Sequence, residues 1–400
     1  MSSFQAGAGI APFDLPEMPR SGDGTPLVAR CLVLDDGATR VAIVSGTWIG
    51  LYGREAALVE EAACEALGLP PERVMIAATH IHSGPPIFAT DERVSGHVAE
   101  HLAAAAAEAA RQGCELRPAR LGVATDHLPG ITRVRRIVQR DGSVITLRRA
   151  WPQHWGWADD PESVGPEEEL DDLLTVVRVE DEAGEPIAAI MHFTGHPIPD
   201  FMGYAAALVE RTLPGATCLI LNGCLGSVDT PFEQPMRGRT QQEQLPILGD
   251  VLGYRTLELI ARAETSAEVR LAACSAPVSL PVAPDFAANP YAEREMWRDA
   301  VESGRFESRV QCISMGDLAL AGVPGEPQVG YGWDVANASP FALTRAVGNV
   351  GRSCAYLFHP EARARGGYEV DPAMCALTSG EALGIVLEAH RGCMAEMQRR

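Results

Sequence analysis

The order of apolar and polar positions along the chain alternates between the two-residue period of strands and the longer period of helices. Two apolar runs, at residues 27–34 and 41–46, flank an Asp-Asp-Gly turn at 35–37, which is typical of a β-hairpin. In residues 54–67 apolar side chains recur at helical spacing, and Gly68 ends the predicted helix. The first part of the chain therefore predicts strands and helices in alternation.

The same alternation continues toward the C-terminus. It predicts strands at 74–79, 141–149 and 216–223, hairpins at 175–197 and 310–324, and helices at 93–112, 240–264, 291–303 and from about 379 onward. Residues 150–170, with three tryptophans and many acidic side chains, break this rhythm and predict a loop, either packed on the surface or closing over a site as a lid. Because there is no internal repeat and no Gly-Ser or Pro-rich linker, we expect one large α/β domain over residues 1–400.

Composition and charge narrow the class of partner. The chain is 46% hydrophobic and 22% charged, with no run of eighteen apolar residues, so we expect a soluble protein without membrane insertion. A formal net charge of −20 would repel nucleic acid and anionic membranes. The expected partner is a small-molecule substrate, and formation of a homo-oligomer stays open.

The N-terminal residues and the cysteines bear on the compartment. The first twenty residues contain no basic segment followed by an apolar one, which is the pattern of a secretory signal. Ten cysteines are spread along the chain without a CxxC pair, which favours reduced core thiols over a disulfide framework or a zinc ribbon. We therefore expect a cytoplasmic protein.

Histidine and acidic side chains that could bind a metal or transfer a proton stand where predicted strands end. The segment THIHSGPP at 79–86 places His80 and His82 one residue apart at the end of an apolar run. In an extended chain residues i and i+2 point to the same face, so the two imidazoles can converge on one point. This geometry suits a metal ion or a proton-transfer pair. The alternative is a turn whose histidines merely bond to the backbone.

Two further strand ends carry side chains that can bind a metal. His196 stands in a Gly-His-Pro turn and Glu326 in a Pro-Gly-Glu turn. A His-x-His pair together with a distant histidine and a glutamate is an ordinary ligand set for Zn²⁺. His97 and His101 are also spaced for a metal on the predicted helix 93–112, but a solvated helix face is the simpler interpretation.

The motif ATHIHSGP resembles the histidine motif of the neutral/alkaline non-lysosomal ceramidase family, zinc amidases that cleave the N-acyl bond of ceramide. Other motifs resemble the family as well, and their order along the chain is that of the family. They are AGAGIAP at 6–12, FTGHP at 193–197, GSVDTP at 226–231, PGE at 324–326, and a tyrosine before GGYE at 366–369. The resemblance spans nearly the whole chain and implies mixed β-sheets flanked by helices, as in the neutral ceramidase catalytic domain. It also implies a single catalytic domain without the C-terminal immunoglobulin-like domain of the secreted ceramidases.

The resemblance implies roles for particular residues. The implied zinc ligands are His80, His196, Glu326 and Tyr356. His82 and Tyr368 would line the reacting centre, and Arg135 would orient the substrate carbonyl or stabilise its developing oxyanion. Tyrosine is an unusual zinc ligand, so Tyr356 could instead hydrogen-bond to the water on the metal.

One motif departs from the family. Where the family has Gly-Asp-x-Ser-Pro, with a serine proposed to act in catalysis, this chain reads Gly-Ser-Val-Asp-Thr-Pro at 226–231. Asp229 falls at the serine position without a gap and Thr230 does so with one inserted residue, while Ser227 is the only serine in the motif. The sequence leaves open which of the three replaces the family serine, and it puts ceramide itself in doubt as the substrate.

The working hypothesis is a zinc-dependent amidohydrolase that acts on a non-peptide C–N bond through zinc-activated water. His82 would act as general base and then acid, and Arg135 or Tyr368 would donate to the oxyanion. Asp229 would position water or a substrate amine, which favours a cationic leaving group. The alternatives are a metal-dependent esterase or lactonase, a lyase or isomerase on the same scaffold, and a non-catalytic metal-containing binding protein.

Overall fold

A mixed sheet of eight strands forms the centre of the molecule. The computed structural model describes residues 4–13, 27–84, 92–147, 161–196, 200–230, 241–289, 292–371 and 376–399. The strand order is β12-β11-β10-β5-β1-β2-β3-β4. Only the end pairs β3–β4 and β11–β12 are parallel. The strands are β1 (Gln5–Pro12), β2 (Val28–Asp35), β3 (Arg40–Gly46), β4 (Val74–Ala78), β5 (Arg117–His127), β10 (Leu173–Asp181), β11 (Pro186–Phe193) and β12 (Thr217–Asn222).

A second sheet packs against the first and shares a core with it. Its four strands have the order β14-β15-β16-β18 and are β14 (Leu271–Pro281), β15 (Arg305–Met315), β16 (Leu318–Gly322) and β18 (Leu343–Val347). One cluster of buried apolar side chains joins the two sheets, including Leu32, Ile43 and Leu219 from the first and Ile313 and Leu320 from the second. The sheets therefore face each other across a shared apolar core.

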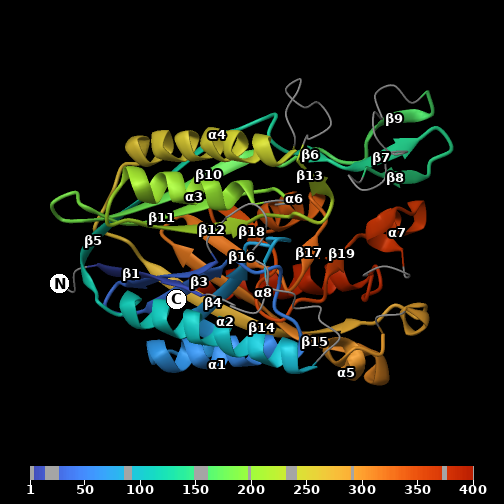
Figure 1. Ribbon diagram of the computed structural model, residues 1–400, viewed down its shortest axis with the longest axis horizontal. Helices are drawn as coiled ribbons and strands as arrows, with labels where there is room; N and C mark the ends of the chain where they lie inside the picture. The colour runs from blue at the N-terminus through green and yellow to red at the C-terminus, as the bar shows by residue number, and fades with distance from the viewer. Residues whose placement is uncertain are drawn as a thin grey trace.

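Helices cover the outer faces of these strands (Figure 1). The pair α3 (Phe201–Thr212) and α4 (Gln241–Arg262) lies on one side, and the pair α1 (Gly53–Leu67) and α2 (Glu92–Gly113) lies on the opposite side. On the second sheet, α8 (Ala382–Arg399) packs against β14 and β15. Across the described ranges, no helix is long and apolar enough to cross a membrane.

Short strands gather at one end of the large sheet (Figure 1). Two of them pair in parallel, β17 (Glu326–Pro327) with β19 (Tyr356–Leu357), and two pair antiparallel, β6 (Arg133–Val134) with β13 (Val228–Asp229). A three-stranded sheet lies beyond them, formed by β8 (Val144–Thr146), β7 (Arg136–Gln139) and β9 (Ser163–Pro166). The remaining helices are α5 (Glu295–Ser303), α6 (Gly330–Asn337) and α7 (Pro360–Arg365).

The hydrophobic pattern correctly predicted the more regular elements. The hairpin β2–β3 pairs Asp35 with Arg40 across the expected turn. Helix α1 ends as predicted, because Gly68 adopts the left-handed conformation with φ of 62° and closes the last turn. The predicted helices 93–112 and 240–264 correspond to α2 and α4.

Other elements differ from the pattern. The AGAG motif forms strand β1, which sequence periodicity did not predict because Gly7 and Gly9 have no side chains. A Cβ added at Gly9 would lie 2.2 Å from the Ala109 carbonyl oxygen, so these glycines allow α2 to lie directly on the strand. Residues 163–166, expected in a loop, form β9, whereas the tryptophan-containing part at 150–160 lies outside the described residues.

Candidate metal centre

Two neighbouring strand ends carry the buried histidines. His80 follows β4 by two residues, and His196 follows β11 by three. Asn222, the last residue of β12, joins these ends, because its side-chain nitrogen donates to the Thr79 carbonyl at 3.3 Å and to the Gly195 carbonyl at 2.7 Å. Each of these carbonyls belongs to the residue before a histidine. The sheet therefore fixes the relative positions of the two imidazoles through the backbone.

Three imidazole nitrogens converge on one point. The Nε2 atoms of His80, His82 and His196 lie 3.0, 3.1 and 3.2 Å from one another. Nitrogen ligands bonded to zinc at about 2.0–2.1 Å in a tetrahedral arrangement lie about 3.3 Å apart, so the observed triangle fits one face of such a site. Among the described residues, these three form the only group of histidine, cysteine or acidic side chains with this convergence.

The carboxylate of Glu326 adds a fourth donor. Its Oε2 atom lies 3.3 Å from His80 Nε2, which again matches the spacing of neighbouring ligands on one ion. Glu326 and Tyr356 are direct partners in the parallel pair β17–β19, and both are buried. Register partners project to the same face of a sheet, so the Tyr356 phenol belongs to the same side of the site.

The proton on His80 is held on the nitrogen that faces away from the cluster. Its Nδ1 atom lies 2.6 Å from the Ile49 carbonyl oxygen, which accepts the Nδ1 proton. The lone pair of Nε2 is therefore free to bind a metal, as in other sites where a backbone carbonyl fixes the tautomer. In His196, Nδ1 likewise lies 3.2 Å from the Leu225 carbonyl oxygen.

Backbone strain is concentrated at the site. In the described ranges, positive φ outside glycine occurs only at His80 (69°), Asn349 (52°) and Ala355 (60°). Each such residue costs about 1–3 kcal/mol, so it persists only where its surroundings enforce it. Asn349 contacts His80 Nδ1 through its side-chain nitrogen at 3.1 Å, and Ala355 directly precedes Tyr356.

The convergence of His80 and His82 thus has a different cause from the one that the sequence indicated. We expected an extended strand to place both rings on one face, but β4 ends at Ala78 and the chain then turns. The left-handed φ of His80 brings the two rings to a centroid distance of 4.7 Å. His82 is exposed, whereas His80 and His196 are buried, so His82 forms the solvent side of the cluster.

Arg135 lies directly behind the metal centre. Its Nη1 atom is 3.3 Å from His196 Nδ1, and its Nη2 atom donates to the Tyr356 hydroxyl at 3.2 Å and to the Gly226 carbonyl at 2.7 Å. Its Nε atom donates to Glu369 at 2.7 Å. Arg135 is only 1% exposed, so its charge acts in a medium of low polarity close to the ligands.

Glu369, in the Gly-Gly-Tyr-Glu motif, balances two buried arginines. Besides Arg135, it accepts from Arg136 Nη1 at 2.9 Å and from the Thr146 hydroxyl at 2.8 Å. Gly367 has φ of 104°, and a Cβ there would lie 2.4 Å from Arg136 Nη1, which explains the glycine. The next residue, Tyr368, stacks edge-on against Tyr356 with ring centroids 6.0 Å apart.

Electrostatics favour neutral imidazoles at the site. Burial lowers the pKa of His80 to about 3. Burial and then the Arg135 charge lower the pKa of His196 well below its usual value. Burial also raises the pKa of the Tyr356 phenol, and Glu326 adds to that shift. For Glu369, burial alone would raise the pKa, but Arg135 and Arg136 outweigh it and hold the pKa below its usual value. Neutral imidazoles are the form that binds a metal.

The structure describes the divergent motif at 226–231 as far as Thr230. Ser227 is fully buried, and its hydroxyl accepts a hydrogen bond from the Val329 amide at 2.8 Å, which is a structural role. Asp229 lies close enough to Arg135 to raise the pKa of that guanidinium, although less than Tyr356 and Glu369 do. Its Oδ1 atom accepts from the Thr230 amide at 2.7 Å. Asp229 is therefore the residue of the motif that reaches toward the site.

All eight residues singled out from the sequence belong to one region of the structure. Their separate roles as ligand, acid/base or oxyanion donor stay predictions. Sequence reasoning missed Asn222, Asn349 and Glu369, which hold the others in place. Only Glu369 had a signal, since it ends a motif that was already noted.

Removing the Asn222 side chain tests this supporting role. In the Asn222→Ala variant we expect metal affinity to fall about 10- to 100-fold, because the two strand ends that carry His80 and His196 lose their common hydrogen bonds. Competition with a chromogenic chelator measures the affinity. Asn337→Ala, at an exposed position of α6, is the matched control. Equal affinities for the two variants would contradict the role.

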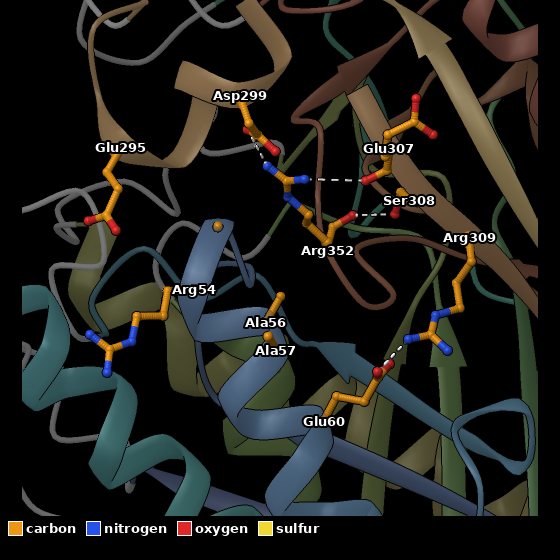
Figure 2. A pocket seen from close by; sticks show the side chains of 11 residues that line it. Arg54, Ala56, Ala57, Glu60, Glu295, Asp299, Glu307, Ser308, Arg309 and Arg352 are labelled. Atoms are coloured by element: carbon orange, nitrogen blue, oxygen red, sulfur yellow. Dashed lines mark hydrogen bonds and ion pairs between the residues drawn. The ribbon is translucent and has the colours of Figure 1, made fainter. Parts of the chain in front are cut away.

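A separate cavity of about 550 Å³ lies between α1, α5 and β15 (Figure 2). None of the site residues lines it. Its charged side chains largely neutralise one another, because Arg352 pairs with Asp299 at 2.8 Å and Arg309 pairs with Glu60. The lining carries four carboxylates and three guanidinium groups, a formal charge of −1, so this cavity has no strong field for a charged ligand.

Comparison with known proteins identifies the fold. The chain is similar to the crystal structure of neutral ceramidase from Pseudomonas aeruginosa, with a TM-score of 0.71 and 17% identity over 100% of this chain and 75% of that one. It is also similar to a ceramidase complexed with C2, with a TM-score of 0.72 and 17% identity over 100% of this chain and 76% of that one. No protein-family model and no curated protein matches the sequence. The likeness confirms the predicted ceramidase-like fold of mixed sheets flanked by helices.

Proposed function

We propose that this protein is a zinc-dependent hydrolase that cleaves the amide (N-acyl) bond of a small molecule. The observation that carries the proposal is the position of His80 Nε2, which lies 3.2 Å from His196 Nε2 and 3.3 Å from Glu326 Oε2, with His82 Nε2 beside them, at the strand ends of a ceramidase-like fold. Two of the three imidazoles are buried with their Nε2 atoms 3.2 Å apart, and a cation between neutral imidazole nitrogens would stabilise this arrangement.

The residues that would hold the metal are His80, His196, Glu326 and Tyr356. The two imidazoles and the carboxylate have the spacing of ligands on one ion, and the phenol is brought to them by the pairing of β17 with β19. A zinc ion bound there supplies a Lewis acid and lowers the pKa of water to about 7. Burial and Glu326 raise the pKa of the Tyr356 phenol, and the charge of Arg135, which donates to its hydroxyl, offsets only part of that shift.

The remaining site residues act on the substrate and its protons. His82 is exposed on the open side of the cluster, where it can accept a proton from water and return it to the leaving amine. The Tyr368 hydroxyl, beside Tyr356, would donate to the oxyanion that forms from the substrate carbonyl. Arg135, held in place by Glu369, would stabilise the same negative charge from its buried position beside His196 and Tyr356. Asp229 would position the substrate amine.

Product mass tests the reaction class. Wild-type protein loaded with Zn²⁺ should convert an N-acyl amide into a carboxylic acid and an amine, with one atom of ¹⁸O from labelled water in the acid. Chelated protein should be inactive and should recover when Zn²⁺ is added back. A product whose mass equals that of the substrate, or that lacks the added water, would instead indicate an isomerase or a lyase. Hydrolysis of esters or lactones but of no amide would overturn the proposed bond type.

The His82→Ala variant separates acid/base chemistry from metal binding. We expect kcat to fall about 10²- to 10⁴-fold while the zinc content stays at the wild-type level, because a positioned proton-transfer group contributes roughly that factor. Elemental mass spectrometry and steady-state kinetics measure the two quantities. His97→Ala, at an exposed histidine of α2, serves as control and should match wild type in both. Loss of zinc from the His82 variant would make this residue a ligand instead.

A further inference from the structure

Three cysteines that are far apart in the sequence meet beneath α8, on the second sheet. Cys274 of β14 and Cys312 of β15 are direct cross-strand partners. Cys393 lies on the buried face of α8, which packs against both strands. Cys274 and Cys312 lie close enough to the Cys393 sulfur to affect its ionisation. We refer to these three residues as the thiol cluster.

The thiol cluster contains a proton acceptor. Cys274 Sγ also lies 3.5 Å from Glu396 Oε2, and Glu396 is three residues after Cys393 on the same face of α8. Cys274 and Glu396 are partly exposed, whereas Cys312 and Cys393 are 0% and 2% exposed. Cys274 and Glu396 therefore form the solvent side of the cluster.

Cys393 differs electrostatically from the other buried cysteines. Burial raises the pKa of Cys218 to about 12 and that of Cys64 to about 11. For Cys393, hydrogen bonds from Cys312 and then from Cys274 outweigh burial and lower the pKa to about 7. Two neighbouring thiols thus solvate its thiolate, which is the nucleophilic form of cysteine.

We propose that the thiol cluster is a redox-modification site, at which a hydroperoxide oxidises Cys393 and Cys274 then forms a disulfide bond with it between α8 and β14. Cys274 is the partner because it is the accessible thiol and because its hydrogen bond to Glu396, one helical turn from Cys393, holds it against this face of α8. Cys312, deeper in the core, acts as a hydrogen-bond donor to the Cys393 sulfur.

The proposed chemistry proceeds in two steps. In the first, the Cys393 thiolate attacks one oxygen of the hydroperoxide and the O–O bond breaks. Hydroxide or alkoxide leaves and takes up a proton from solvent, and Cys393 becomes a sulfenic acid. In the second, the Cys274 sulfur attacks the Cys393 sulfur and the S–O bond breaks; the thiol proton of Cys274 passes by way of Glu396 to the leaving hydroxide, which is released as water. The two thiols together supply the two electrons that reduce the peroxide. A dithiol reductant then reduces the disulfide and restores the two thiols.

Hydrogen peroxide and peptide mass spectrometry test the site on the full chain under native conditions at pH 7. We expect a Cys274–Cys393 linked peptide, reversible by dithiothreitol, and oxidation of Cys393 about ten times faster or more than that of the exposed Cys114. In the Cys274→Ser variant the sulfenic acid should persist and be trapped by dimedone on Cys393. The Cys114→Ser variant, outside the cluster, should form the linked peptide at the wild-type rate.

The same experiment can overturn the proposal. Oxidation of Cys114 while Cys274 and Cys393 stay reduced would do so, and so would a Cys393 that oxidises without ever linking to Cys274. The dimedone adduct in Cys274→Ser requires no disulfide, so its absence from folded protein would separately exclude Cys393 as the reactive thiol. Near-ultraviolet circular dichroism of each variant establishes that the protein tested is folded.

Discussion

Replacing His196 by alanine is expected to abolish metal binding and hydrolysis together. His196 is 1% exposed, and its Nε2 atom lies within 3.2 Å of both other histidine nitrogens, so no neighbouring side chain can take its place. We expect zinc to fall from about one ion per chain to background. Affinity should drop by more than the roughly 10- to 100-fold that follows the loss of an outer hydrogen bond. Elemental mass spectrometry and an N-acyl amide assay measure the two effects.

A matched control separates loss of the metal from loss of the fold. The His97→Ala variant removes an exposed imidazole from α2 and should keep both zinc and activity. Thermal unfolding of the chelated proteins should show a cooperative transition for His196→Ala, with a midpoint lowered by the cavity that the missing ring leaves. A His196→Ala protein that retains one zinc ion per chain would contradict the assignment of this ligand.

The largest expected effect on stability comes from Glu369→Ala. This change leaves the guanidinium groups of Arg135 and Arg136 buried without the carboxylate that bridges them. Removal of one partner from a buried ion pair typically costs about 3–5 kcal/mol of unfolding free energy. Activity should fall as well, since Arg135 loses the contact that orients it toward Tyr356.

Urea denaturation of the chelated variant measures the change in unfolding free energy. The control is Glu388→Ala, which breaks the exposed pair with Arg391 on α8 and should leave the free energy essentially unchanged. If Glu369→Ala were as stable as Glu388→Ala, then Glu167, which also pairs with Arg136, would suffice to balance the buried charge. The bridging role of Glu369 would then be wrong.

Sequence reasoning located the site because its residues follow strand ends in short, recognisable motifs. His80, His196 and Glu326 each stand in a turn rich in glycine or proline after an apolar run. The structure brings their donor atoms together, with His80 Nε2 at 3.2 Å from His196 Nε2 and at 3.3 Å from Glu326 Oε2. Motifs of this kind can be found from the sequence because the turn and the functional side chain are adjacent in the chain.

The supporting residues could not be found in that way. Asn222 acts through side-chain hydrogen bonds and Asn349 through backbone hydrogen bonds to segments more than twenty residues away, and nothing in their local sequence distinguishes them from other asparagines. The left-handed backbone at His80 is equally hidden, because a histidine there would ordinarily be predicted to continue the strand. Tertiary contacts enforce both features, so they emerge only once the sheets are assembled.

The departure at 226–231 illustrates the same limit. The sequence left Ser227, Asp229 and Thr230 as three candidates for one role. Burial and hydrogen bonding give Ser227 a structural function, since its hydroxyl caps the Val329 amide. Asp229 is the candidate whose charge acts on Arg135. Alignment by motif could not make this distinction, because it depends on where strand β13 places each side chain.

Anomalous diffraction from crystals grown without added metal tests the central claim most directly. Data collected just above and just below the zinc absorption edge should give one difference peak about 2.0–2.2 Å from the Nε2 atoms of His80 and His196 and from a Glu326 carboxylate oxygen. Crystals that diffract well and show no peak between these side chains, even after soaking with Zn²⁺, would contradict a zinc centre at this site.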